Sequence, residues 1–452
     1  MATIKTTNPF TGKLIKKYER FSEEQINNCL QKSAATFPAW AATDITERAT
    51  LIKKVADLLL ERTDSLARLM TEEMGKPIVQ SRAEIEKCAW VCDFYAKNGA
   101  KFLSDALIET DAVESFISYD PLGTVLAIMP WNYPFWQVLR FAAPTLTAGN
   151  TAILKHAENV TGCALALEQL FVDAGYPEGC FQAILADHEA IEELIGHEVV
   201  QAVSLTGSEK AGRAIAEIAG KNLKKTVLEL GGNNACVVWE DADLDEHLDI
   251  MVKARMQNNG QSCIAAKRFI VVETIYDEFL DKFKKKVAGF VTGSPMDEDT
   301  YISVMAREDL AKGLEDQVKK SVEMGAEVVM GNTRKGAYFE PTLLTKVTAE
   351  MPVFKEETFG PVAAIIKVRD RQAAIDMARN SDFGLGTMLF TQDIEEARKA
   401  ISQIPDGAFF INEMVKSDPR LPFGGTKNSG YGRELSREGI LAFVNEKTVY
   451  IN

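Results

Sequence analysis

The sequence predicts an α/β fold built on parallel sheets, and two observations lead to this prediction. Short apolar segments alternate with helical patterns at intervals of roughly 20–30 residues, as in successive βαβ units. The 452 residues, 46% of them hydrophobic, are enough for about three domain-sized units. The expected strands of the first half are 125–130, 151–156, 181–186, 202–206 and 225–230, and those of the second half are 234–239, 268–273, 326–330, 362–368, 386–391 and 408–412.

The N-terminal part of the chain is expected to be mostly helical. Residues 1–20 contain a turn between two short extended pieces, and a helical pattern follows over 22–98. Ser22 opens this pattern with the capping-box sequence Ser-Glu-Glu-Gln. Residues 103–121 are then expected to be extended. The tail, 447–451, is predicted to be a lone strand and is a candidate for pairing across a subunit interface.

The composition excludes several classes of function. Lys and Arg number 51 against 65 Asp and Glu, and the resulting net charge of −14 argues against nucleic acid and anionic membranes as partners. No apolar run is long enough for a membrane span, and the N-terminus lacks the apolar core of a signal peptide. The seven cysteines are odd in number and scattered along the chain, which favours reduced thiols over a disulfide framework. We therefore expect a cytoplasmic protein.

A metal site is not expected. The chain has four histidines and contains neither an HExxH sequence nor a cluster of Cys and His residues with zinc-ligand spacing. Cys88 and Cys92 stand four residues apart in a helical pattern without a second pair nearby. They are therefore interpreted as core-facing residues.

Polar residues follow most of the expected strands of the first half. Ligands bind parallel sheets at the carboxyl ends of the strands, so these residues are candidates for a binding site. The glycine pattern GxGxxG of common dinucleotide-binding loops does not occur anywhere in the chain. The residues at the strand ends are Trp131 and Asn132, then Lys155 and Glu158, then Gly207 and Ser208, and finally Glu229.

Cys263 lies in a small-residue turn, Asn-Asn-Gly-Gln-Ser-Cys, between an amphipathic segment and an apolar one. Such a turn can hold a side chain at a surface edge, which suits a nucleophilic thiol. A free cysteine has a pKa near ~8.5, so a nucleophile at this position needs activation by its surroundings. The alternative is a small residue that fills a helix–strand junction, and the hexapeptide alone does not decide between the two.

Seven motifs in order resemble the NAD(P)-dependent aldehyde dehydrogenase superfamily over essentially the whole chain. Within it, the chain is most similar to the short bacterial succinate-semialdehyde dehydrogenase group. The motifs are PWNYP (130–134), LKHAE (154–158), LTGS (205–208), LELGGNN (228–234), GQSC (260–263), EETFGP (356–361) and PFGGTKNSGYGRE (422–434).

The resemblance implies an architecture of two doubly wound parallel-sheet domains and a small β element for oligomerisation. The dinucleotide-binding domain would comprise 1–104 and 122–230, and the catalytic domain 231–438. The oligomerisation element would comprise 105–121 and 439–452. A homodimer or a homotetramer follows by analogy.

The resemblance also implies a catalytic set of three residues. Cys263 as a thiolate would attack the aldehyde carbon, and the resulting oxyanion would be held by the Asn132 side-chain amide and the Cys263 backbone N–H. Glu229 would activate the water that hydrolyses the thioester. Because Glu229 is present, acyl transfer to coenzyme A is the less favoured reaction. A catalytically silent relative would be expected to lack one of these three residues.

The cofactor residues follow from the same motifs. Lys155 and Glu158 match the pair that reaches the adenosine ribose, where a carboxylate accepts the hydroxyls and repels a 2′-phosphate. NAD is therefore favoured, and Lys155 leaves NADP possible. Gly207 and Ser208 open a helix that would meet the pyrophosphate. The residues expected near the nicotinamide half are Trp131, Glu357 and Phe359.

The expected substrate is a small aldehyde, with succinate semialdehyde as the leading candidate. Relatives specific for it bind its carboxylate with arginines, and Arg140 matches one such position, while Ser417 lies in a loop that supplies a further contact. Gln257 stands where a second arginine is expected, which leaves a broad dehydrogenase of neutral aldehydes as the alternative. A structural ion pair is the competing role for Arg140. The residues that could replace the missing arginine are Arg255, Lys416 and Arg420.

Overall fold

The first sheet of the computed structural model, which describes residues 3–452, has the strand order β21-β9-β8-β5-β6-β7. Five strands are parallel, and β21 pairs antiparallel at one edge. The strand order reverses between β5 and β8, which places a ligand crevice at their carboxyl ends. The bounds are β5 (Thr124–Met129), β6 (Thr151–His156), β7 (Phe181–Ala183), β8 (Val200–Thr206), β9 (Lys225–Glu229) and β21 (Gly430–Tyr431).

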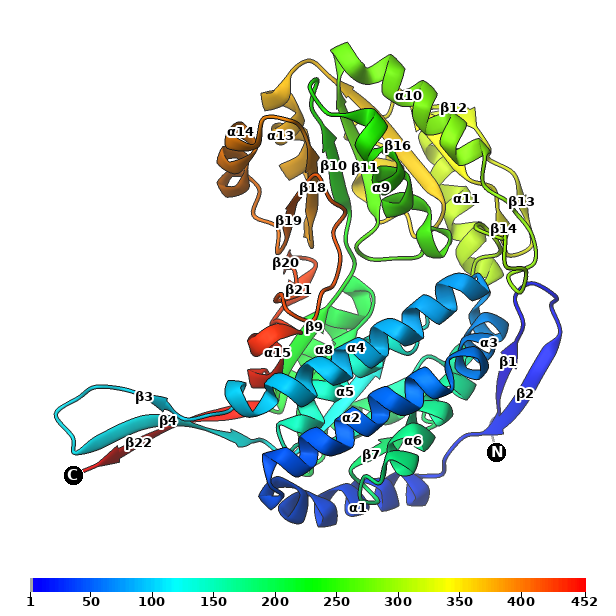
Figure 1. Ribbon diagram of the computed structural model, residues 1–452. Helices are drawn as coiled ribbons and strands as arrows, with labels where there is room; N and C mark the ends of the chain where they lie inside the picture. Colours follow the sequence, from blue (N-terminus) through cyan, green and yellow to red (C-terminus); the bar gives the residue numbers. More distant parts are fainter. Residues whose placement is uncertain (1–2) are drawn as a thin grey trace.

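Helices cover both faces of this sheet because its strands are apolar on both sides. Val125 and Ala127 of β5 pack on one face against α2, α4, α5 and α6, whereas Leu126 packs on the other against α7 and α8 (Figure 1). The helices are α1 (Glu23–Ala42), α2 (Ile45–Glu61), α3 (Thr63–Met74), α4 (Ile78–Phe102), α5 (Trp136–Thr147), α6 (Thr161–Ala174), α7 (Glu189–Gly196) and α8 (Glu209–Lys221).

The second sheet has seven strands in the order β12-β15-β16-β11-β10-β18-β19. Helices α9 and α10 cover one face, and α11, α13 and α14 cover the other (Figure 1). Its strands are β10 (Asn234–Val238), β11 (Ala266–Val272), β12 (Glu327–Met330), β15 (Thr342–Thr345), β16 (Val362–Val368), β18 (Thr387–Phe390) and β19 (Phe409–Ile411). Its helices are α9 (Leu244–Met256), α10 (Glu273–Ala288), α11 (Glu308–Glu323), α12 (Pro352–Lys355), α13 (Arg371–Arg379) and α14 (Ile394–Ala400).

Two details of this sheet correct the sequence prediction. Strand β15 is absent from the expected strands, because its four residues are too few to give a period. Strand β12 was expected but pairs antiparallel with β15, so the chain makes a short reversal at this edge instead of a βαβ crossover. The other expected strands are present, with ends that differ by a few residues.

The N-terminal segment agrees with its prediction where the structure describes it. Strands β1 (Thr3–Thr7) and β2 (Leu14–Glu19) form an antiparallel hairpin. The Ser22 side chain accepts from the Gln25 backbone N–H, and the Gln25 side chain accepts from the Ser22 N–H, which completes the capping box. Residues 1 and 2 of the expected extended piece lie outside the described residues.

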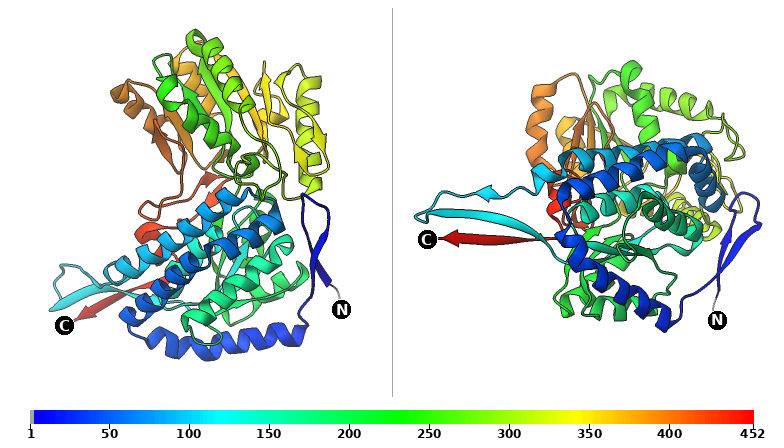
Figure 2. Two further views of the ribbon diagram at one scale, coloured as in Figure 1. Left: turned by 45° about the vertical axis from the view of Figure 1, so that its right-hand side comes forward. Right: turned by 60° about the horizontal axis from the view of Figure 1, so that its bottom comes forward.

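A three-stranded arm projects from the body of the molecule (Figures 1 and 2). It contains β3 (Ala106–Leu107), β4 (Glu114–Pro121) and the C-terminal strand β22 (Val444–Ile451), and β22 pairs with β4 along its whole length. Leu107 and Val113 on this arm are 77% and 86% exposed. The tail is therefore a strand as expected, and its partner in this chain is β4.

Shorter elements complete the fold. The pairs β13 (Arg334–Lys335) with β14 (Tyr338–Phe339) and β17 (Phe383–Gly384) with β20 (Thr426–Lys427) are two-residue ladders, and α15 (Ser436–Leu441) precedes β22. Across residues 3–452, the helices are all too short or too polar to cross a bilayer.

Candidate active site

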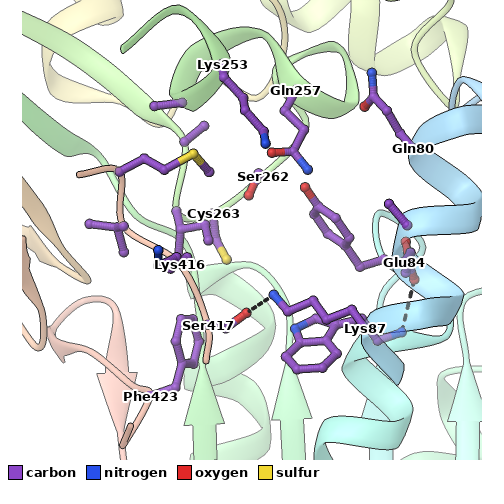
Figure 3. Close-up of a pocket in the computed structure, with 18 of the residues that line it drawn as sticks. Gln80, Glu84, Lys87, Lys253, Gln257, Ser262, Cys263, Lys416, Ser417 and Phe423 are labelled. Carbon is purple, nitrogen blue, oxygen red and sulfur yellow. Dashed lines mark hydrogen bonds between the residues drawn. The ribbon is translucent and has the colours of Figure 1, made fainter. Parts of the chain in front are cut away.

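A cavity of about 500 Å³ opens onto Cys263, and its walls come from both halves of the chain. Helices α4 and α5 supply one wall, α9 and the turn after it supply a second, and residues 413–417 supply a third. Lys87, Lys253, Gln257 and Ser417 are drawn around this cavity together with Cys263 (Figure 3). The nucleophile predicted from the sequence therefore lies at a ligand-sized cavity.

The turn before Cys263 is held in an unusual backbone conformation. Asn258, Asn259 and Gly260 have φ values of 56°, 52° and 71°, in the left-handed region that Asn and Gly adopt most readily. Side-chain amides then fix the turn: the Asn259 carbonyl oxygen accepts from the Ser303 N–H at 2.7 Å, and that of Gln261 accepts from Ala306 at 2.9 Å. This explains why the hexapeptide is rich in amides.

Lys267 lies close to Cys263 and was missed by the sequence analysis. Burial raises the pKa of the Cys263 thiol to about 11, and the nearby Lys267 ammonium opposes this rise. The Lys267 amine donates to the backbone oxygens of Ser262 and Cys263 at 2.8 and 2.7 Å and to the Glu357 carboxylate at 2.9 Å. The signal available in the sequence was the pair of basic residues Lys267 and Arg268 at the start of the apolar strand β11.

Asn132 faces the same turn. It is buried, its amide nitrogen donates to the Gln261 carbonyl at 3.1 Å, and its amide oxygen accepts from the Gln137 amide at 3.0 Å. Both contacts fix the orientation of the amide group. The asparagine is thereby held beside the nucleophile turn, where an oxyanion donor is required.

A buried ion pair supports the loop that carries Asn132. The Glu84 carboxylate accepts from the backbone N–H groups of Phe135 and Trp136, both at 3.0 Å, at the start of α5. Its second oxygen is paired with Lys76, and both side chains are almost fully buried. His156 also contacts this loop through the Pro134 carbonyl at 2.9 Å. Glu84 and Lys76 were not singled out from the sequence, because no motif surrounds them.

Glu229 ends β9 in a crowded, buried position. In the described part of the chain neither carboxylate oxygen has a hydrogen-bond partner, and a Cβ on Gly424 would lie 2.8 Å from one of them. Burial raises the pKa of the Glu229 carboxyl well above its usual range, and the Glu434 carboxylate adds to this rise, while Arg140 and Arg433 oppose it. The carboxyl of Glu229 is therefore biased toward its protonated form relative to an exposed glutamate.

The chain between β9 and β10 brings Glu229 toward the nucleophile. A Cβ on Gly232 would lie 2.7 Å from the Cys263 carbonyl oxygen. The Asn234 amide also donates to that carbonyl at 2.7 Å. The base candidate thus ends a strand of the first sheet, while the nucleophile lies in the turn that precedes β11 of the second sheet.

A second cavity of about 260 Å³ reaches Cys263 from the crevice between β5 and β8. Trp131 and Phe359 meet edge to face with ring centroids 5.7 Å apart. The sequence-predicted residues that line this cavity are Trp131, Asn132, Gly207, Ser208, Cys263, Glu357 and Phe359. Ser208 is the N-cap of α8, where free N–H groups favour an anion such as a pyrophosphate. Apolar rings near Cys263 and an anion site farther out fit a nicotinamide dinucleotide.

Lys155 and Glu158 lie outside that cavity, at the carboxyl end of the neighbouring strand β6. Lys155 is buried, and this burial lowers its pKa, which Glu158 partly restores. The Glu158 carboxylate is paired with Arg20 at 2.7 Å. Arg20 was not predicted, since it lies far away in sequence, directly after β2.

Arg140 lines the substrate cavity but is engaged by another residue. Its guanidinium forms a buried ion pair with Glu434 and lies over the Phe423 ring, 4.6 Å from the centroid. This is the structural role that the sequence analysis left as the alternative. Gln257 and Ser417 line the same cavity, as predicted for substrate contacts.

The residues suggested as substitutes for the missing arginine each have other partners in the structure. Arg255 is fully buried and donates to the backbone carbonyls of four residues. Lys416 is paired with Glu413 at 2.7 Å, and Arg420 with Asp418 at 2.6 Å.

This fold and site define a class of enzyme: residues 1–449 match the model of the aldehyde dehydrogenase family, and the chain belongs to that family. The chain is an NAD(P)-dependent aldehyde dehydrogenase, so it oxidises an aldehyde to its carboxylic acid, and the predicted fold class is confirmed.

The similar proteins are full-length matches. A probable succinate-semialdehyde dehydrogenase [NADP(+)] of Synechocystis sp. is 47% identical, with 99% of each chain covered. The succinate semialdehyde dehydrogenase [NAD(P)+] of Escherichia coli is 43% identical over 98% of this chain and 96% of that protein. The crystal structure of succinic semialdehyde dehydrogenase from Streptococcus pyogenes with NADP+ has a TM-score of 0.97, 35% identity and 99% coverage of both chains.

Proposed function

We propose that the chain oxidises succinate semialdehyde to succinate. The supporting observation is the charge of the cavity at Cys263, whose wall holds four cationic side chains, Lys87, Arg140, Lys253 and Lys416, and two carboxylates, Glu84 and Glu413. A cationic surplus next to the nucleophile favours an aldehyde that carries an anionic group. The names of the similar full-length relatives support the same substrate.

The proposed mechanism assigns one step to each catalytic residue. Cys263 as a thiolate adds to the aldehyde carbon, and the oxygen becomes an oxyanion that accepts from the Asn132 amide and the Cys263 backbone N–H. Bound NAD(P)+ supplies the hydride acceptor. Glu229 then takes a proton from the water that attacks the thioester, which releases the acid and restores the thiolate.

A direct comparison of two substrates tests the proposed substrate. The kcat/KM for succinate semialdehyde is expected to exceed that for butyraldehyde, which has the same chain length without the charge, by about a hundredfold or more. NAD(P)H absorbance measures both rates. Equal values would contradict the proposal and favour a dehydrogenase of neutral aldehydes, an alternative supported by Gln257 and by the ion pair of Arg140.

We further propose that the enzyme accepts NADP as well as NAD, although Glu158 favours NAD. The Arg20 guanidinium, 2.7 Å from the Glu158 carboxylate, compensates the charge that would repel a 2′-phosphate. Lys155 next to this pair adds a second positive charge. Two of the relatives described above carry NADP(+) and NAD(P)+ in their names, which supports dual use.

Substitution of Arg20 by Gln is expected to move the cofactor preference toward NAD. The freed Glu158 carboxylate would repel the 2′-phosphate, so the ratio of kcat/KM with NADP to that with NAD should fall about tenfold, or about 1.4 kcal/mol. Steady-state rates with each cofactor measure this ratio. Arg62→Gln, which removes a different arginine ion pair with Asp173, is the control and should leave the ratio unchanged. An unchanged ratio in the Arg20 variant would contradict the assignment.

The oligomeric state of the chain is also a proposal. We propose a homodimer or homotetramer joined through the arm of β3, β4 and β22, because its exposed Leu107 and Val113 are unfavourable in water. Sedimentation velocity tests this, and a monomer would contradict it.

All seven cysteines are free thiols, which supports a cytoplasmic location that cell fractionation can test. The domain limits 1–104 with 122–230, 231–438, and 105–121 with 439–452 stay predictions for limited proteolysis.

A further inference from the structure

Lys87 is a partly buried cation of the cavity at Cys263, and the packing of the fold gives it no carboxylate partner in the described residues. It extends from α4 into the cavity, and its ammonium lies 4.1 Å from the centroid of the Trp136 ring (Figure 3). It donates to the Ser417 hydroxyl at 2.8 Å. Within residues 3–452 no carboxylate oxygen lies within 4.0 Å of its nitrogen. A half-buried ammonium without a counterion is costly, so its position calls for a reason.

The other cations of the cavity differ from Lys87 in their surroundings. Arg140 is paired with Glu434 and Lys416 with Glu413. Lys253 has no carboxylate partner in the described part of the chain, but it is exposed at the end of α9, where water solvates its charge. Lys87 alone among these four combines partial burial with the lack of a carboxylate partner in residues 3–452.

We propose that the Lys87 ammonium, together with the Ser417 hydroxyl, binds the free carboxylate of an acidic aldehyde substrate. This inference rests on the proposed function and names the residue that replaces the arginine absent at position 257. The Ser417 oxygen accepts from Lys87, so its own hydrogen is free to donate to a second carboxylate oxygen. Two donors side by side match the two oxygens of a carboxylate.

The arrangement also determines how the bound substrate is oriented. Cys263 and Lys87 both line the cavity and come from different walls, the turn before β11 and helix α4. An aldehyde with a carboxylate at its far end can then present one end to each group. A neutral aldehyde of the same length lacks the second contact and would bind without a fixed orientation.

Substitution of Lys87 by Met tests the inference. The kcat/KM for succinate semialdehyde is expected to fall about 30-fold, mainly through KM, whereas that for butyraldehyde should change by less than about threefold. Lys97→Met is the matched control, because this lysine lies on the same helix in an exposed ion pair with Asp93 and outside the cavity, and it should leave both substrates unchanged. Lys87→Arg keeps the charge and should retain most of the activity with the acid.

The pH dependence supplies a second readout that a purely structural role would not change. Burial lowers the pKa of Lys87 to about 8, Arg140 on α5 acts in the same direction, and Cys88, Glu84 and Asp418 oppose it. The ammonium is charged below this value and neutral above it. The preference of the wild-type enzyme for the acid should therefore decrease as pH rises through about 8, and the Lys87→Arg variant should keep its preference at pH 9.

These experiments distinguish a failure of the Lys87 inference from a failure of the proposed substrate. A wild-type preference for the acid that Lys87→Met leaves intact, or that Lys253→Met removes instead, would overturn the inference while the proposed substrate stands. Equal loss with both aldehydes in a Lys87→Met variant whose melting temperature is unchanged would assign Lys87 a structural role and overturn it too. A wild type that oxidises both aldehydes equally would overturn both the proposed substrate and the proposed role of Lys87.

Discussion

Replacement of Cys263 by Ala is expected to lower kcat for NAD(P)H formation by about 10⁴-fold or more, because the variant cannot form the covalent adduct. Alanine removes a single sulfur from a site fixed by backbone and amide contacts, so the cavities around it should persist. Stopped-flow absorbance measures turnover, and quenching of protein fluorescence measures cofactor binding. Binding of NAD(P)H is expected to stay within about threefold of the wild type.

Cys236 provides the control for this prediction. It is a fully buried thiol of β10 in the catalytic half, and Cys236→Ala should lower stability while it leaves kcat nearly unchanged. Substantial aldehyde oxidation by the Cys263→Ala variant would show that another group carries the chemistry.

The second large effect is expected from Glu229→Gln. The side chain keeps its size but cannot accept a proton, so kcat should fall about 10²–10³-fold through slow hydrolysis of the thioester. NAD(P)H forms before that step, and a burst of about one equivalent per active site should therefore persist. Rapid-quench measurements can detect the acyl group on Cys263. Hydroxylamine cleaves thioesters without a base and is expected to restore much of the turnover.

Glu229 also predicts a pH dependence with a definite sign. Because burial and Glu434 raise the pKa of its carboxyl, the base form becomes more abundant as pH increases, and hydrolysis should accelerate in the same direction. The Glu229→Gln variant should lose this acceleration. Glu315→Gln, which removes a surface ion pair with Arg334, is the control. A burst amplitude near zero in the Glu229 variant would place its role before hydride transfer and contradict the assignment.

Much of the fold was predictable because most strands combine an apolar sequence with a helix on either side. The prediction failed at β15, whose four residues leave no period to detect, and at β12, whose antiparallel pairing depends on its neighbour. Cys263, Asn132 and Glu229 were found because each lies in a local motif. Their roles depend on contacts that the motifs do not contain.

Several of the missed residues have partners that are distant in sequence. Lys87 on α4 meets Ser417, and Lys76 and Glu84 support a loop that begins at residue 130. Arg140 was interpreted as a substrate contact because its partner, Glu434, lies near the other end of the chain. Such pairs are created by the packing of the two halves, and a single sequence without relatives contains no direct signal for them.

Cys263 and Gln137 line both cavities, so the reacting carbon is approached from two separate sides. With the two cavities assigned as proposed, the aldehyde would arrive between α4 and α9, and the cofactor from the crevice between β5 and β8. Neither molecule has to pass through the space that the other occupies. On this assignment the reduced cofactor would have an exit of its own while the acyl group is still attached to Cys263, so the relative rates of the two steps would set the order in which the products leave.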